Sequence, residues 1–452
     1  MFMQNLDSTV IATALPTMAK AFGADPVHMN VALTSYLLSL AVFIPASGWV
    51  ADRYGARTVF RAAIAVFTIG SILCGRADSL AFLVVSRILQ GIGGAMMVPV
   101  GRLTVVRTFN KSELIRAMSF VAIPGLIGPM LGPLAGGLIV GYLHWRVIFF
   151  VNLPIGIAGL YLVLRHLPDF RTEHSDPLDV VGLILFGSGI ALLSYVLEIF
   201  GETSLSSREI IGLLALSASL LFGYVLHART EKHPLLHLGL FRLRTFSCSV
   251  VGGFVTRLGS GGMPFLLPLL YQVGLGYSAV QSGLLIMPQP LAAMSLKLTM
   301  PKILARFGYR RVLVANTLLM GMLMMLFATV GPDTSVAVIV AQAFAYGFVS
   351  SLQFTSMNTL VYSDVPDRET SQASTMASTG QQMSLSFGVA TASLTAALFI
   401  PDRTRASAVD MMHGTHQAFI VLGALTTLSS LVFFMLKATD GANVSMHRDQ
   451  PV

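Results

Sequence analysis

The sequence predicts an all-helical protein that crosses a lipid bilayer many times. Of its 452 residues, 54% are apolar and only 11% are charged, whereas ordinary soluble domains carry roughly 25% charged residues. The mean hydropathy of +0.74 is too high for a soluble chain, because surface-to-volume scaling leaves much of any soluble fold exposed to water. A soluble enzyme is therefore excluded. The third observation is that the apolar residues gather in runs long enough to cross a membrane.

We count fourteen such runs, each near the 20 or so residues that a helix needs to span the hydrocarbon core. Each run is expected to be helical, because lipid offers no partners for backbone N–H and C=O groups. The runs at 335–358 and 371–399 are polar for membrane spans, so we expect them to face the protein interior and not the lipid. In chain order, the predicted spans cover residues 1–22, 31–51, 58–75, 80–106, 114–141, 145–166, 178–200, 208–227, 246–272, 279–300, 312–330, 335–358, 371–399 and 415–437.

Loop charge indicates which ends of the spans face the cytoplasm. Arg and Lys concentrate in alternate loops, beginning with Arg53 and Arg57 after the second span, whereas the loops at 23–30 and 273–278 contain neither. Cytoplasmic loops carry the excess of Lys and Arg in membrane proteins. We therefore expect the charged loops in the cytoplasm, together with both termini. The same rule accounts for the formal net charge of +8 without a nucleic-acid partner.

A short internal repeat predicts how the spans are grouped. The stretch ADRYGARTV at 51–59 resembles ARFGYRRVL at 305–313, about 253 residues later. Each stretch connects the second and third spans of a set of six, which is the pattern of parallel halves related by an axis along the membrane normal. The predicted domains are a six-helix bundle at 1–166, a linker with two extra spans at 167–245, a second six-helix bundle at 246–437 and a cytoplasmic tail at 438–452.

The loop GWVADRYGAR between the second and third spans is a candidate gate. Glycines permit a tight turn close to a neighbouring helix, a carboxylate can accept hydrogen bonds from helix N-termini in the other half, and arginines can pair across the same seam. Such a loop could hold the cytoplasmic side closed in one state, although an ordinary positive-inside loop explains its composition equally well. The gating residues we predict are Gly48, Asp52, Arg53, Gly55 and Arg57.

Arg87 lies several residues inside the fourth predicted span. A charge at that depth costs at least about 2.5 kcal/mol, so such a residue usually has a partner or faces an aqueous cavity. The residues that follow include Gly91, Gly93 and Gly94. Because glycines remove side-chain bulk, we expect neighbouring helices to approach this segment closely.

The fifth predicted span carries small residues at three- and four-residue spacing, which places them along one face of a helix. A face of this kind favours close packing, and the interspersed prolines permit a bend. The helix is therefore suited to a rocking motion, although tight static packing alone would favour the same composition. The residues of this motif are Gly125, Gly128, Pro129, Gly132, Pro133, Gly136 and Gly137.

Asp7, in the first predicted span, is the most informative acidic residue. Desolvation disfavours the charged form of a carboxylate, so a carboxyl group inside a membrane can bind and release a proton near neutral pH. We predict that Asp7 carries protons; the alternative is a structural hydrogen bond to a neighbouring helix. Only six residues precede Asp7, and we expect the true translation start to lie upstream of Met1.

Polar residues inside other spans are candidates for a substrate cavity. Arg257 lies in the middle of its span and is the basic residue of the second half that we most expect to face a cavity. Gln90, Asn152 and Asn358 are the other residues that we predict to line it.

Two further kinds of chemistry find no support in the sequence. There is no Gly-Lys dipeptide, hence no phosphate-binding loop for ATP. Histidine pairs such as His233 and His237 lie in predicted loops without acidic or thiol neighbours, so no metal site is expected. We therefore expect no cofactor and no direct use of ATP.

Five motifs in order resemble those of the major facilitator superfamily, specifically its fourteen-span drug:proton antiporters of the EmrB/QacA type. LDSTVIATALP (6–16) is similar to that family's first-helix motif, GWVADRYGAR (48–57) to its loop motif and RILQGIGGAMM (87–97) to its fourth-helix motif. GPMLGPLAGG (128–137) is similar to its fifth-helix antiporter motif, and WRVIFFVNLPIG (145–156) to the start of its sixth helix. The resemblance extends over nearly the whole chain.

The resemblance implies the major facilitator fold, with two six-helix bundles and two inserted helices. It also implies multidrug export driven by protons through alternating access, in a bacterial inner membrane. Asp7 and Arg87 would then take part in proton coupling, and Asp52 in gating. The expected partners are a small organic substrate, protons and the lipid bilayer, with the protein acting as a monomer.

The charge of the substrate stays open. Exporters of lipophilic cations generally need acidic groups in the cavity, where Asp7 stands almost alone, whereas Arg87 and Arg257 would suit a carboxylate. An exporter of organic anions, such as citrate-like carboxylates, is therefore the second hypothesis. A receptor or scaffold that transports nothing is a remote third, because it would need soluble extensions for its partners and we expect none.

Overall fold

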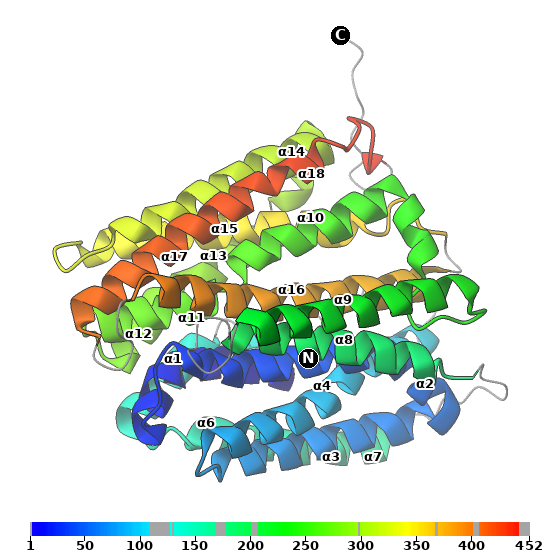
Figure 1. Ribbon diagram of the computed structural model, residues 1–452, viewed down its shortest axis with the longest axis horizontal. Coiled ribbons are helices and arrows are strands. Elements are labelled where there is room, and N and C mark those ends of the chain that lie inside the picture. Colours follow the sequence, from blue (N-terminus) through cyan, green and yellow to red (C-terminus); the bar gives the residue numbers. More distant parts are fainter. Residues whose placement is uncertain are drawn as a thin grey trace. The chain divides into compact units, whose positions relative to one another are not determined.

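A computed structural model describes residues 2–108, 127–128, 131–167, 177–199, 207–296, 299–366, 369–400 and 406–442, and every regular element within these ranges is a helix. The chain divides into two compact units, Met1–Leu236 and His237–Val452. Within each unit the long helices run alongside one another (Figure 1). The prediction of an all-helical protein is confirmed.

The first unit contains four long helices at its start and a helical hairpin at its end. Its helix α4 packs against both α2 and α3, and α8 packs against α9. In chain order its elements are α1 (Phe2–Phe22), the 3-10 turn η1 (His28–Asn30), α2 (Val31–Tyr54), α3 (Ala56–Gly75), α4 (Leu80–Thr108), a helix at Leu131–Tyr142, α6 (Val147–Phe150), α7 (Asn152–His166), α8 (Val180–Ile199) and α9 (Ser207–Thr230).

Glycines on α4 allow the close packing that the sequence predicts there. A Cβ atom built on Gly91 would lie 2.9 Å from the carbonyl oxygen of Tyr36 on α2. One built on Gly93 would lie 2.5 Å from the backbone nitrogen of Phe67 on α3. Any larger residue would force these backbones apart, so the glycines hold α4 between its two neighbours.

The α8–α9 hairpin is joined at one end by Asp179, which precedes α8. Its carboxylate accepts hydrogen bonds from the backbone N–H groups of Gly182 and Leu235 and lies 2.7 Å from Nε2 of His227 on α9. Burial alone would raise the pKa of Asp179, but these hydrogen bonds outweigh it and lower the pKa below its usual value. Asp179 therefore connects the start of α8, the end of α9 and the segment that follows.

The second unit has the same kind of architecture, and its first long helix continues through a π-helical turn. Its elements are the 3-10 turn η2 (Leu238–Arg242), α10 (Arg244–Ser260), α11 (Met263–Pro268), the π turn η3 (Leu269–Gly274), α12 (Ala279–Ile286), α13 (Pro288–Leu296), α14 (Met300–Leu326), the 3-10 turn η4 (Phe327–Thr329), α15 (Val336–Leu360), α16 (Thr370–Leu398), α17 (Ala408–Leu428) and α18 (Ser430–Phe433).

The internal repeat seen in the sequence is also a repeat of backbone conformation. Gly55, between α2 and α3, has a φ angle of +88°, and Gly308, inside α14, has a φ angle of +71°. The two glycines occupy equivalent positions of the repeated stretch. Gly55 and Gly308 combine this positive φ with extended ψ angles of 135° and 164°. Such a backbone conformation is essentially restricted to glycine and costs other residues about 1–3 kcal/mol, which explains why glycine occurs at both turns.

Ten helices in the described ranges are long and apolar enough to cross a bilayer, so the chain is a multi-pass membrane protein. These candidate spans cover His28–Tyr54, Ala56–Gly75, Leu80–Gly101, Val147–His166, Val180–Leu197, Arg208–Thr230, Arg244–Gly274, Lys302–Thr329, Val336–Leu360 and Ala408–Phe433.

Ten is fewer than the fourteen spans predicted. Three of the other four differ for physical reasons, and the fourth lies partly outside the described residues. The helices α1 and α16 carry many polar residues, and part of the predicted span 114–141 lies outside the described residues. The predicted span 279–300 is divided into α12 and α13. Pro288 and Pro290 explain that division, because proline lacks the N–H group that a continuous helix needs.

Candidate functional site

The carboxylate of Asp7 on α1 lies at the centre of a buried polar network. Its Oδ2 accepts a hydrogen bond of 2.6 Å from Nη1 of Arg87. Its Oδ1 accepts hydrogen bonds from Nε2 of Gln90 at 2.9 Å and from Nδ2 of Asn152 at 2.7 Å. Asp7 is 4% exposed, and its three partners are 0–1% exposed. In each of these contacts an N–H group donates a hydrogen bond to the carboxylate, and the bond from Arg87 is charge-assisted.

Four helices bring these groups together. Arg87 and Gln90 lie three positions apart on α4 and therefore share one face, while Asn152 is the first residue of α7. Ser71 on α3 joins them: its Oγ accepts from Asn152 at 2.9 Å and from Gln90 at 3.3 Å. The same hydroxyl donates to the carbonyl of Phe149 at 2.8 Å, which anchors the network to the segment before α7.

Arg87 is held from several sides. Its Nε donates to the carbonyl of Ala32 at 3.0 Å, and its Nη1 also donates to Oε1 of Gln90 at 2.6 Å. Its guanidinium carbon lies 4.3 Å from the centre of the Tyr36 ring, a cation–π contact. Among the described residues, its Nη2 has no hydrogen-bond partner. One donor group of the buried guanidinium therefore remains available.

The predicted fifth-span motif packs against α1 beside Asp7. A Cβ atom on Gly132 would overlap Oγ1 of Thr9, and one on Gly136 would lie 2.5 Å from the carbonyl oxygen of Val10. A Cβ atom on Gly128 would lie 2.9 Å from the backbone nitrogen of Leu6 on α1. The stripe of small residues thus makes the close approach expected of it. Pro133 and Gly137 are buried on this helix, whereas Gly125 and Pro129 lie outside the described residues.

Four of the five predicted gating residues, Asp52, Arg53, Gly55 and Arg57, lie at or beside the turn between α2 and α3. Nη2 of Arg57 donates to the carbonyl of Leu164 near the end of α7, where the helix dipole favours a cation. Arg53 is exposed and Asp52 is half-buried. A Cβ atom on Gly48 would meet no atom of the described residues within 4 Å, so no neighbouring helix among them packs closely at this glycine. Gly48 lies on an exposed part of α2, away from the turn itself.

In the second unit, Arg257 on α10 is buried with a different set of neighbours. Its Nη2 donates to Oδ1 of Asn358 at 3.1 Å, and its guanidinium carbon lies 5.0 Å from the centre of the Phe354 ring. Arg257 is 6% exposed. No carboxylate of the described residues forms an ion pair with it. Two of the predicted cavity residues, Arg257 and Asn358, are therefore in contact.

Sequence reasoning missed some members of these networks. Ser71 and Tyr36 are polar residues in apolar runs, and only their position beside Arg87 and Gln90 reveals their role. On α15, Gln353 is fully buried and its Nε2 donates to Oγ1 of Thr317 on α14 at 2.6 Å. The polarity of the 335–358 span was the available signal for this second network.

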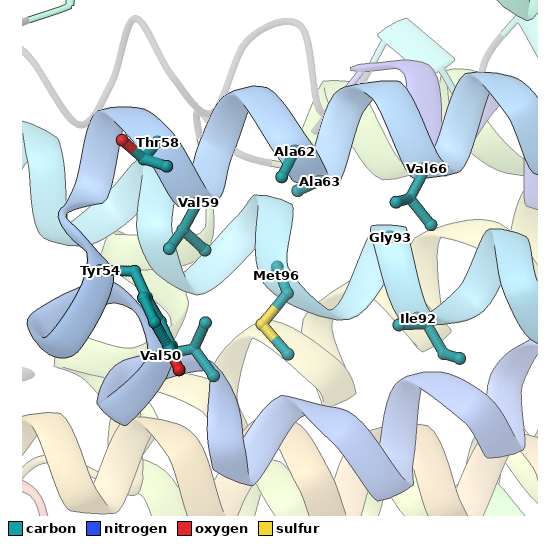
Figure 2. Close-up of a pocket in the computed structure, with 10 residues that line it drawn as sticks. All are labelled: Val50, Tyr54, Thr58, Val59, Ala62, Ala63, Val66, Ile92, Gly93 and Met96. Atoms are coloured by element: carbon teal, nitrogen blue, oxygen red, sulfur yellow. The ribbon is translucent and has the colours of Figure 1, made fainter.

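Neither an apolar cavity in the first unit nor any metal-binding cluster adds a polar site to these networks in the described part of the chain. A cavity of about 320 Å³ lies between α2, α3 and α4, and Figure 2 shows that almost all its lining side chains are apolar, including Val50, Val66 and Met96. Within the described ranges, no three His, Cys, Asp or Glu residues lie close enough together to hold a metal ion.

Comparison with protein families identifies the superfamily. The model of the Major Facilitator Superfamily matches residues 1–389. A protein of Klebsiella pneumoniae (strain 342) named "Putative multidrug resistance protein MdtD" is 41% identical over 454 aligned residues, which cover 99% of this chain and 95% of that protein. A protein of the same name from Escherichia coli O7:K1 (strain IAI39 / ExPEC) is 44% identical over 398 residues, covering 88% of this chain and 84% of that one.

Solved structures of low sequence identity share the fold. A D-xylose-proton symporter matches with a TM-score of 0.69 at 14% identity, covering 97% of this chain and 96% of the symporter. A POT family transporter in complex with 5-aminolevulinic acid matches with a TM-score of 0.68 at 16% identity, covering 96% and 93% of the two chains. At such identities the likeness extends to the fold and no further.

Proposed function

The chain belongs to the major facilitator superfamily of membrane transporters, and on that premise we propose that it is a proton-coupled exporter of small organic compounds. Its relatives with 41–44% identity carry a multidrug-resistance name, which supports export of the multidrug type. The proposal includes fourteen spans, arranged as six-helix bundles at 1–166 and 246–437 around an inserted pair at 167–245. It also includes a monomer in a bacterial inner membrane, with both termini, including the tail at 438–452, in the cytoplasm.

The observation that carries the proposal is that, among the described residues, every hydrogen bond to the side chain of Asp7 comes from a donor. Arg87, Gln90 and Asn152 all direct N–H groups at the carboxylate. If Asp7 takes up a proton, its new O–H group faces these N–H groups, and it gains an acceptor among them only if the amide of Gln90 or Asn152 turns over. At the same time Arg87 loses its counter-charge in a buried site, which is costly. Protonation therefore requires the network to rearrange, and that requirement links a proton to a conformational change.

This link suits alternating access. Asp7 would be protonated from the outward-open cavity and deprotonated toward the cytoplasm, with solute release tied to protonation. One proton crossing a potential of 100 mV provides about 2.3 kcal/mol, which corresponds to roughly a fifty-fold concentration ratio of a neutral solute. That driving force is useful for an exporter even before a pH gradient is added.

We assign the other residues by their neighbours. Gln90 and Asn152, predicted from the sequence to line a substrate cavity, contact Asp7, so we place them in the coupling network instead. The small residues of the fifth-span motif would let that helix move against α1. The turn of Asp52 and Arg57 would act as the gate of the cytoplasmic side.

A second candidate function, export of organic anions, is favoured by Arg257. This buried arginine has an amide and an aromatic ring as neighbours and no described carboxylate in an ion pair. A substrate carboxylate could supply the missing negative charge through paired N–H···O bonds. Arg257 and Asn358 are the residues that would contact it.

Transport by the full chain in proteoliposomes tests both candidates. A labelled carboxylate such as citrate and a dye cation such as ethidium would be offered under an imposed pH gradient, with proton flux recorded in parallel. The variant Asp7→Asn should reduce gradient-driven transport to background while leaving solute counterflow measurable. Asp78→Asn is the matched control, since Asp78 is 93% exposed and pairs with Arg146 at the surface.

Gradient-driven transport that survives in Asp7→Asn would refute proton coupling through this residue. Carboxylate transport that is fully retained in Arg257→Ala would remove the basis of the organic-anion hypothesis. Absence of counterflow for every solute in a broad panel would leave the receptor hypothesis in place of a transporter.

A further inference from the structure

A cavity between α2, α4 and α8 lies apart from the contacts of Asp7. Its volume is about 460 Å³, within the range of roughly 300–1,000 Å³ that is usual for small-molecule sites. On α2 it is lined by Val31, Ser35, Leu38 and Val42, which recur every three or four positions and so form one stripe along the helix. The cavity belongs entirely to the first unit.

The inserted helix α8 forms the opposite wall. Its lining residues include Gly187, Ala191 and Ser194, again one stripe of small side chains. At Gly187 the two helices come close, since a Cβ atom there would lie 3.0 Å from Cγ1 of Val42. Ala191, one turn further along, is exposed. The small side chains of α8 thus leave space that larger residues would fill.

The lining is apolar apart from the imidazole of His28 and a few hydroxyl groups. None of the lining residues is Asp, Glu, Lys or Arg, so the cavity offers no group of fixed charge to balance a charged ligand. Oγ of Ser35, which is 7% exposed, has no hydrogen-bond partner among the described residues. Buried hydroxyl groups are normally hydrogen-bonded, so this one is available to a ligand.

We propose that this cavity is a second ligand site, which binds a neutral, amphipathic small molecule whose polar group hydrogen-bonds Ser35 and whose apolar part lies between α2 and α8. A lipid acyl chain fits these observations less well, because it offers nothing to the Ser35 hydroxyl. The site goes beyond the proposed transport function and does not depend on it, since binding there requires no gradient.

Some of the residues that line the cavity are sequence neighbours of residues in the Asp7–Arg87 network. Ser35 precedes Tyr36, whose ring contacts Arg87, and Ile88 in the cavity wall follows Arg87 in the chain. Ser39, also in the wall, donates to the carbonyl of Ile88 at 2.8 Å. A ligand between α2 and α8 therefore touches the same stretch of α2 that holds the buried arginine.

Binding of N-phenyl-1-naphthylamine, a neutral fluorescent molecule with one N–H group, tests the proposal. The full chain would be reconstituted in lipid nanodiscs, and saturable fluorescence above that of empty nanodiscs would be measured without any gradient. Ser35→Ala should weaken binding about three- to tenfold, the usual effect of one lost hydrogen bond. Ala191→Trp should abolish saturable binding by filling the cavity from α8.

Ala218→Trp is the matched control, because Ala218 is an exposed residue of α9 that does not line the cavity; it should bind the probe as the unaltered protein does. Three outcomes would overturn the proposal: no saturable binding to the unaltered protein, unchanged binding in Ala191→Trp, or unchanged binding in Ser35→Ala. The last of these would indicate an occupant held by apolar contacts alone, such as an acyl chain. Since no transport is measured, failure here leaves the exporter proposal untouched.

Discussion

The two units each bury an arginine within a helix, and the two arginines differ in what surrounds them. Arg87 is 0% exposed and contacts the carboxylate of Asp7, an amide oxygen and a backbone carbonyl. Arg257 is 6% exposed and contacts the amide oxygen of Asn358 and the ring of Phe354. Both lie where an uncompensated charge is expensive.

The difference indicates that the two units would respond to different ions. The first unit balances its own buried charge, so under the proposed function its state would depend on whether Asp7 carries a proton. The second unit has a buried positive charge without an ion-pair partner among the described carboxylates, so its state would respond to an anion from outside. Proton chemistry in one unit and substrate recognition in the other is the arrangement that these contacts favour.

The largest expected effect is on stability when the balanced pair is broken. Arg87→Met should lower the free energy of unfolding by about 3–5 kcal/mol, because it leaves the buried carboxylate of Asp7 without its cation. Arg257→Met should leave the free energy of unfolding unchanged or raise it slightly, because it removes a buried charge and leaves no described carboxylate without an ion-pair partner. Equilibrium unfolding in mixed micelles, followed by circular dichroism, measures both.

A double variant sharpens this result. Asp7→Asn combined with Arg87→Met removes both charges and should recover most of the loss, giving a coupling energy well above the scatter of independent sites. Equal destabilisation by Arg87→Met and Arg257→Met would show that the two arginines are held in the same way.

The next effect concerns binding of an anion in the second unit. If a substrate carboxylate pairs with Arg257, Arg257→Met should raise its KM about tenfold or more, since hydrogen bonds between charged groups contribute about 1.5–3 kcal/mol. Transport of a dye cation by the same variant serves as the control and should not weaken. Concentration-dependent uptake into proteoliposomes gives both values, and an unchanged carboxylate KM would argue against this role.

Substitution of a glycine that packs beside Asp7 or beside Arg257 should lower the free energy of unfolding by a smaller amount. Gly132→Leu would force the fifth-span helix away from Thr9 on α1, and Gly388→Leu would place its Cβ 2.7 Å from the carbonyl oxygen of Arg257. Overpacking of this kind costs typically about 1–3 kcal/mol. Gly212→Leu is the control, because a Cβ there meets nothing within 4 Å. Gly132→Leu should also impair proton coupling more than Gly388→Leu does, and the reverse order would contradict the division between the units.

The smallest effect is expected at a third arginine, whose ion pair is partly exposed. Arg244, at the start of α10, donates from Nε and Nη2 to the two carboxylate oxygens of Asp440 at 2.8 and 2.6 Å. Burial alone would raise the pKa of Asp440, but the hydrogen bonds from Arg244 and from the backbone of Lys437 outweigh it and lower the pKa. A carboxylate of this kind stabilises the fold above its unfolded pKa of about 3.9 and loses that contribution as the pH falls through the folded value.

Asp440→Asn should therefore cost less than about 1 kcal/mol at pH 7, because Arg244 is partly exposed to solvent. The difference between variant and unaltered protein should disappear as the pH is lowered below about 3.9. Unfolding midpoints measured from pH 7 to pH 3 test this. A difference that persists at pH 3 would mean that the pair is not what the substitution removes.

The sequence by itself determined the helical membrane fold and the identity of the unusual residues. Lipid satisfies no backbone hydrogen bonds, so apolar runs of this length must be helices, and a charge among them, such as Asp7 or Arg87, is conspicuous because of its cost. Gly55 and Gly308 could likewise be matched from the repeat alone, because the two stretches align with an offset of 253 residues.

Only the tertiary structure decided which of these residues meet. Neutral amides such as Gln90 and Asn152 carry no cost large enough to reveal a partner, and either could have faced a substrate instead of Asp7. The contact between Arg257 and Asn358 joins residues 101 positions apart, and the space beside Ser35 exists only because α8 packs against α2. Hydrophobicity is a property of each residue and can be read from the sequence directly. Hydrogen-bond partners and cavities, in contrast, depend on how helices distant in sequence pack together.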